Sequence, residues 1–77
     1  MKLVNKLTYN ELSDLIGKTA HFVSDCPIFD NFDITCQILS FYNRENIEFV
    51  FNCKNVKSGK SIKIGSNMLN LRFEILE

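Results

Sequence analysis

The sequence predicts a mainly β domain of the α+β class, in which one short N-terminal helix precedes a five-stranded antiparallel bent sheet or small barrel. Two observations support this prediction. Segments in which apolar and polar residues alternate recur at roughly ten-residue spacing, as in strands joined by turns. A single helix-start signal lies before them. The chain has 77 residues, 45% hydrophobic and 23% charged, so we expect one globular domain over residues 1–77.

The helix is expected at about residues 9–16. Thr8 and Glu11 are three residues apart, as in a capping box, where each side chain bonds the backbone N–H of the other residue. Gly17 follows at the position where a left-handed glycine commonly ends a helix. One apolar face is formed by Leu12, Leu15 and Ile16. Because a helix this short is marginally stable alone, we expect this face to pack on the sheet.

Five strands are expected, at about residues 18–25, 33–42, 46–54, 60–64 and 69–76. The third has the clearest alternation, since Phe49, Phe51 and Cys53 share one face. In the second, the apolar phase shifts after Ile38 to Leu39, which predicts a β-bulge or a sharp bend. Such a bend would let the sheet curl into a barrel. An open sheet with the helix on one face satisfies the same alternation.

A Gly65-Ser66-Asn67 turn precedes the last expected strand. One N-terminal helix, five bent antiparallel strands and this turn between the fourth and fifth strands are together similar to the Sm-like small-barrel family, over about residues 8–76. The resemblance implies a small barrel. In that family the turn carries an Arg-Gly-Asn type sequence that helps to form a uridine-binding pocket, whereas Ile64 takes the basic position here and no Asp-Xaa-Asn motif occurs in the second to third strand region. The resemblance therefore does not imply the family's RNA chemistry.

Charges balance over the whole chain but are unevenly distributed. Nine basic and nine acidic residues give a formal net charge of +0, which argues against a dedicated nucleic-acid-binding domain. Residues 19–53 contain one arginine and five acidic residues, whereas residues 54–65 contain four lysines and no acidic residue. These lysines are a candidate phosphate-binding hairpin, although no aromatic residue interleaves with them to stack bases. They are Lys54, Lys57, Lys60 and Lys63. The alternative is a solvated hairpin whose lysines protect an edge strand.

The loop after the first strand combines apolar and acidic residues. We expect Ile28 and Phe29 to form the centre of a protein-binding patch, because interfaces combine an apolar core with a polar rim. The acidic rim would consist of Asp25, Asp30 and Asp33. In an equally weighted alternative, the two apolar side chains fold inward and close the barrel.

These patterns predict a small non-enzymatic protein-interaction module or regulator with an unidentified protein partner. The alternative is a nucleic-acid-binding accessory protein that uses the lysine hairpin. Two further hypotheses are self-association through exposed strand edges and mimicry of nucleic acid by the acidic residues, including Glu45 and Glu48.

No pattern typical of an active site or a metal site is apparent. His21 is the only histidine, and Ser24 has the opposite strand parity, so no catalytic triad is expected. Cys26, Cys36 and Cys53 are too widely spaced for a zinc knuckle, and we expect free, reduced thiols. We therefore expect no enzymatic activity, no cofactor and no metal. The absence of a long apolar run and of a signal-peptide pattern predicts a cytoplasmic protein without membrane contact.

Overall fold

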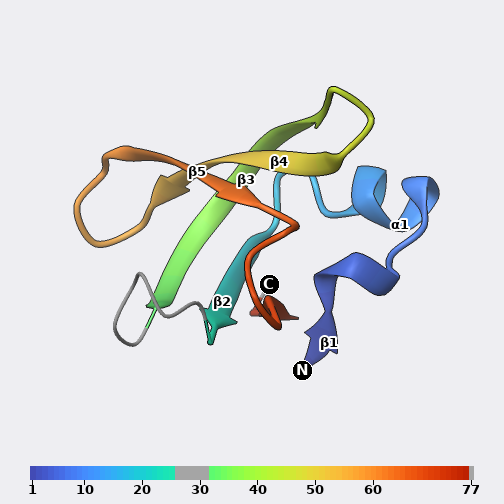
Figure 1. Ribbon diagram of the computed structural model, residues 1–77. Helices are drawn as coiled ribbons and strands as arrows, with labels where there is room; N and C mark the ends of the chain where they lie inside the picture. The colour runs from blue at the N-terminus through green and yellow to red at the C-terminus, as the bar shows by residue number, and fades with distance from the viewer. Residues whose placement is uncertain (26–31, 77) are drawn as a thin grey trace.

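A single antiparallel sheet dominates the computed structural model, which describes residues 1–25 and 32–76 (Figure 1). Within those residues six strands form: β1 (Lys2–Leu3), β2 (Thr19–Ser24), β3 (Phe32–Arg44), β4 (Glu48–Asn55), β5 (Ser61–Gly65) and β6 (Arg72–Ile75). Their order across the sheet is β1-β6-β2-β3-β4-β5, with antiparallel pairing throughout. Strands β1 and β5 are the edges, so the sheet is open and the closed-barrel alternative is wrong.

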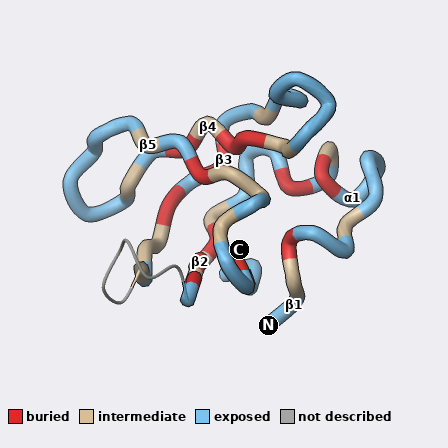
Figure 2. Tube along the Cα trace, in the orientation of Figure 1, coloured by how far each residue is buried: buried red, intermediate tan, exposed pale blue. Residues whose placement is uncertain are grey.

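The sheet is strongly curved, and its inner face forms the core. The rings of Phe22 on β2 and Phe51 on β4 have centroids 5.7 Å apart, although β3 lies between these strands. In a flat sheet, strands two positions apart are separated by roughly 9–10 Å. Phe22 also lies 6.2 Å from the ring of Phe73 on β6. The buried segments therefore converge from several strands on one interior (Figure 2).

The N-terminal segment contains the 3-10 helix η1 (Val4–Lys6) and the helix α1 (Tyr9–Asp14). The predicted capping box is confirmed: Thr8 Oγ1 accepts from the N–H of Glu11 at 3.3 Å, and the N–H of Thr8 donates to Glu11 Oε1 at 3.1 Å. The helix ends two residues before the expected residue 16, because the next N–H groups bond carbonyls only three residues back. Leu12 and Leu15 are buried, whereas Ile16 is exposed and does not belong to the packed face.

The predicted irregularity in the second expected strand is confirmed as a β-bulge in β3. Ile38 pairs with Cys53 but Ser40 pairs with Asn52, so Leu39 has no partner in β4 and is 48% exposed. The bulge changes which side chains face outward. Before it, Cys36 and Ile38 point into the core; after it, Phe41 packs against the core and Tyr42 faces outward.

Two features of the sheet differ from the sequence prediction. Strand β1 was not expected, because only two residues form it and its partners, Arg72 and Phe73, lie at the other end of the chain. Strand β6 is shorter than residues 69–76. Backbone bonds from Met68 to Gly65 and from Leu71 to Met68 turn the chain before it, and Asn70 has a left-handed φ of 50°.

Cys36 and Cys53 are free thiols, and both are buried on the inner face. A hydrogen bond with Cys36, together with burial, raises the pKa of the Cys53 thiol. These two thiols therefore pack as small apolar side chains of the core. Cys26 lies outside the described residues.

Candidate functional site

The predicted protein-binding patch is only partly covered by the structure. Ile28, Phe29 and Asp30 lie outside the described residues, while Asp25 and Asp33 are described. Both of these carboxylates have partners within the chain. They are therefore less available to an external cationic partner than an isolated acidic rim would be.

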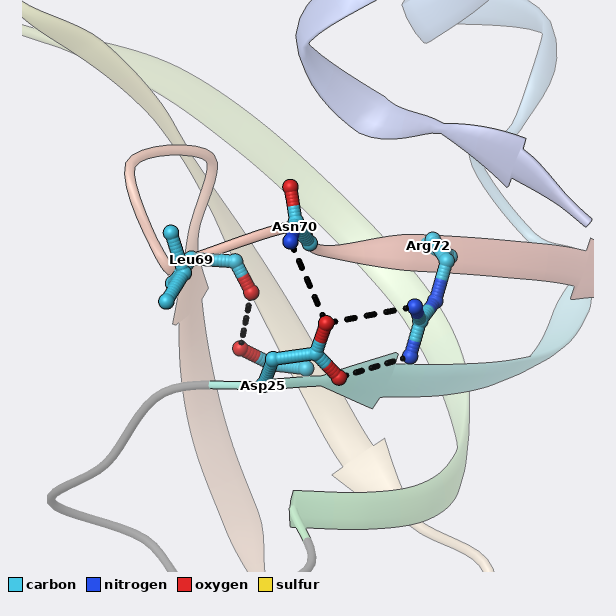
Figure 3. Close-up of polar contacts among 5 residues, drawn as sticks. Asp25, Leu69, Asn70 and Arg72 are labelled. Carbon is cyan, nitrogen blue, oxygen red and sulfur yellow. Dashed lines mark hydrogen bonds and ion pairs between the residues drawn. The ribbon is translucent and has the colours of Figure 1, made fainter.

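Asp25 is bound by two residues near the start of β6 (Figure 3). Arg72 Nη2 lies 3.0 Å from Asp25 Oδ1, and Asn70 Nδ2 donates to Asp25 Oδ2 at 3.2 Å. Hydrogen bonds from Asn70 and then from Arg72 lower the pKa of Asp25. The backbone N–H of Asp25 donates to the carbonyl of Leu69, so this end of β2 is fixed to the segment that leads into β6.

Asp33 is bound by His21, which joins three strands on the outer face of the sheet. His21 Nε2 lies 2.5 Å from Asp33 Oδ1 on β3, and His21 Nδ1 lies 3.4 Å from Glu74 Oε1 on β6. The hydrogen bond to Asp33 is the main cause of a raised pKa of His21, and burial opposes it. The two carboxylates contact opposite ring nitrogens, so they cannot chelate one ion together with His21. Within residues 1–25 and 32–76, no group of three His, Cys, Asp or Glu residues could hold a metal ion.

The four lysines of the candidate phosphate-binding hairpin lie on β4, on β5 and in the exposed turn between these strands. Asn55 shapes this turn: its Oδ1 accepts from the N–H of Lys57 at 2.8 Å, and its carbonyl accepts from the N–H of Gly59 at 2.8 Å. Gly59 has a φ of 71°, a conformation that favours glycine. All four lysines are exposed, and among the described residues none forms an ion pair with a carboxylate. Their ammonium groups therefore remain available to an anion.

An aromatic ring lies beside these lysines, which the sequence did not predict. Lys63 Nζ lies 5.7 Å from the centroid of the Tyr42 ring, within the range of a cation–π contact. The sheet register brings them together, because Tyr42 pairs with Val50, which pairs in turn with Gly65 on β5. No aromatic residue interleaves with the lysines in the sequence, but the sheet brings one to them from β3. The sequence does contain a signal for this position of Tyr42. Ser40 is polar and follows the phase shift, and Tyr42, two residues later on the same strand, must share its outward face.

We define the basic face as the outer surface of β3, β4 and β5 that carries Ser40, Tyr42, Asn52, Lys54 and Lys63. Asn52 Nδ2 donates to Ser40 Oγ at 3.0 Å across the β3–β4 pair. Val50 lies beneath these side chains, is 5% exposed and does not belong to the main core cluster. A pocket of about 360 Å³ adjoins the face and is lined by Leu39, Asn52, Cys53, Ser61, Ile62 and Lys63.

Glu48 is the described acidic residue nearest to the basic face along β4, and its charge is compensated. Its Oε2 lies 3.3 Å from Arg44 Nη2, and its Oε1 accepts from the N–H of Asn67 at 3.3 Å. The Glu48 side chain is only 10% exposed. It therefore leaves the positive potential of the lysines largely intact.

A larger pocket of about 450 Å³ lies at the other end of the molecule, between α1 and β6. Its wall includes Leu7, Leu15 and Ile75, and its charged groups are Lys2, Glu11, Asp14 and Glu74. Two of its carboxylates have partners: Glu11 in the helix cap and Glu74 at His21. Two of its four charged groups are therefore already engaged, whereas the lysines of the basic face have no carboxylate partner within residues 1–25 and 32–76. We favour the basic face as the functional site.

Comparison with known proteins gives no match: no family model, no curated protein and no solved structure resembles this chain closely enough to be assigned to it. The resemblance to the Sm-like small barrels therefore stays a prediction from the sequence. No helix within the described residues is long and apolar enough to cross a membrane.

Proposed function

We propose that this protein is a non-enzymatic nucleic-acid-binding module that uses the basic face and the adjoining turn lysines. The observation that carries the proposal is the position of Lys63 against the exposed ring of Tyr42, in a surface whose lysines have no described carboxylate partner. Ammonium groups that neutralise phosphates supply most of the sequence-independent affinity for nucleic acids. An aromatic ring among them adds a surface on which a base can stack.

A protein-interaction module centred on Ile28 and Phe29 receives less support from the described residues. The two described members of its acidic rim, Asp25 and Asp33, are bound to Arg72 and His21, so their charges are already compensated. In contrast, the lysines of the basic face have no such partners in the described residues. The geometry therefore favours the nucleic-acid hypothesis over the protein-interaction hypothesis.

Salt dependence tests the proposal quantitatively. If Lys54, Lys57, Lys60 and Lys63 each neutralise one phosphate of a single strand, the slope of log affinity against log salt is about −3. Affinity for a short labelled oligonucleotide of mixed sequence should then fall about 50-fold between roughly 50 and 200 mM salt. Fluorescence anisotropy measures this directly.

A matched pair of charge reversals shows whether the predicted surface is responsible. The double variant Lys57→Glu with Lys60→Glu should abolish most binding, because both ammonium groups lie in the exposed turn. The control is Lys2→Glu with Lys6→Glu, which changes the net charge equally on β1 and η1, whereas β5 forms the other edge of the sheet. Equal losses in the two variants, or no binding by the unmodified protein at low salt, would overturn the proposed function.

A further inference from the structure

Resting on the proposed function, we infer that the ligand is single-stranded and that one of its unpaired bases stacks on Tyr42. The ring is 39% exposed and lies on the outer face of β3, next to a row of polar side chains that crosses three strands. This row consists of Ser40, Asn52 and Lys63, which are paired in register. An aromatic ring, an amide, a hydroxyl and an ammonium group are thus placed side by side.

The contact between Lys63 and Tyr42 does not block a base. The ammonium lies 5.7 Å from the ring centroid, near the outer limit of a cation–π contact. An exposed contact of this kind contributes less than a stacked base does. When a single-stranded nucleic acid binds, the flexible Lys63 side chain can move from the Tyr42 ring to a phosphate. A base can then stack on the ring in its place. The lysine gains an ion pair and the ring gains a stacking contact.

The amide of Asn52 can recognise the edge of the same or a neighbouring base. One of its N–H groups donates to Ser40 Oγ, which orients the amide. The second N–H and the carbonyl oxygen have no partner among the described residues and can form hydrogen bonds with the base. In a duplex these base edges are already paired, and the ring faces are covered by neighbouring base pairs. The chemistry of the face therefore fits unpaired bases.

The pocket beside the face offers a place for an adjacent base. It shares Asn52 and Lys63 with the basic face, and Leu39 and Ile62 add apolar surface to its wall. Leu39 is available only because the β-bulge releases it from pairing with β4. Charge complementarity to phosphates and an apolar pocket thus occur within one surface.

The test compares single-stranded and duplex oligonucleotides of the same length with three variants. Tyr42→Leu removes the ring but still covers Val50, whereas Tyr42→Phe keeps the ring. Tyr9→Leu is the control, because Tyr9 is 67% exposed and contacts Phe41 away from the basic face. We expect Tyr42→Leu to weaken single-strand binding at least about 5-fold, with Tyr42→Phe and Tyr9→Leu close to the unmodified protein. Thermal unfolding of each variant confirms that it is folded.

Tyrosine fluorescence tests base stacking on Tyr42 without relying on a change in affinity. The chain has two tyrosines and no tryptophan, so Tyr9→Phe leaves Tyr42 as the only intrinsic fluorophore of that class. Stacking of a base on this ring should quench its fluorescence when the single strand is added, whereas the duplex should leave it unchanged.

The outcomes separate this inference from the proposed function. Equal affinity for duplex and single strand, or equal effects of Tyr42→Leu and Tyr9→Leu, would overturn base stacking. Binding that is lost in the Lys57→Glu, Lys60→Glu protein would still support the proposed function in that case. Absence of binding to either form at low salt would overturn both.

Discussion

His21 Nε2 lies 2.5 Å from Asp33 Oδ1 and joins β2 to β3, while the other nitrogen of the same ring faces Glu74 on β6. The imidazolium form can donate to both carboxylates, whereas a neutral ring can donate to only one. The raised pKa of His21 follows from this arrangement, with the bond to Asp33 as its first cause.

The His21 site predicts a pH dependence of stability. Because the pKa is raised in the folded protein, the stabilisation is fully present below the ordinary value of 6.5 and is lost as the pH rises through the folded value. We expect a loss of about 0.5–1 kcal/mol, as for partly exposed ion pairs. Urea unfolding between pH 6 and pH 8 should show this loss in the unmodified protein and not in His21→Gln. Parallel pH profiles for the two proteins would contradict the prediction.

The last residue of β5, Gly65, is predicted to be coupled to Glu48. A Cβ at Gly65 would collide with Glu48 Oε1, which accepts from the N–H of Asn67. Gly65→Ala should therefore displace the Glu48 carboxylate from Asn67 and Arg44 and destabilise the protein by up to about 1 kcal/mol. In a Glu48→Ala background the same change should be neutral or slightly stabilising, because alanine is preferred to glycine within a strand. Additive effects in this double-mutant cycle, measured by urea unfolding, would exclude the coupling.

The capping box predicts which substitutions at Thr8 are tolerated. Thr8→Ala removes the acceptor for the N–H of Glu11 and should lower the free energy of unfolding by about 1 kcal/mol. Thr8→Ser keeps the hydroxyl and should lie within a few tenths of a kcal/mol of the unmodified protein. Chemical denaturation of the two variants is the measurement. If both lose the same stability, the methyl group rather than the cap is responsible.

The edge strand β5 predicts an effect of Lys63 on self-association. In an antiparallel pair of two β5 strands centred on this residue, the two Lys63 side chains would lie opposite each other, and like charges in that arrangement are unfavourable. Sedimentation velocity should show self-association that is a few-fold tighter for Lys63→Val than for the unmodified protein. Lys54→Val is the matched control, since Lys54 lies on β4, which is paired on both sides. Equal association of the two variants would contradict edge protection by Lys63.

Much of the fold could be predicted because its signals are local. The capping box depends on Thr8 and Glu11 alone, and the bulge at Leu39 appears as a phase shift within one segment. Strand β1 could not be predicted in this way, because pairing with β6 decides it and two residues give no alternation. The predicted end of α1 and the predicted start of β6 were wrong for a related reason. Backbone hydrogen bonds of turns, which the apolar pattern does not reveal, set both boundaries.

The candidate site likewise has a part that could be predicted from the sequence and a part that could not. The lysines stand close together in the sequence, so their hairpin was visible without the structure. Tyr42 reaches Lys63 only through two strand pairings, and Asp25 reaches Arg72 from the opposite end of the chain. The sequence therefore revealed which groups are charged, but only the register revealed which of those charges are already compensated.

Because of the bulge at Leu39, substitutions can accumulate in one half of β3 without affecting the contacts of the other half. Residues before it pair with β2 and carry Asp33 toward His21, whereas residues after it pair only with β4 and carry Tyr42 toward Lys63. If Leu39 were instead paired with β4 without a bulge, continuous alternation would turn Tyr42 inward and expose Phe41. One unpaired residue thus lets a single strand belong to two surfaces of opposite charge, and binding properties can evolve on one without disturbing the ion pairs of the other.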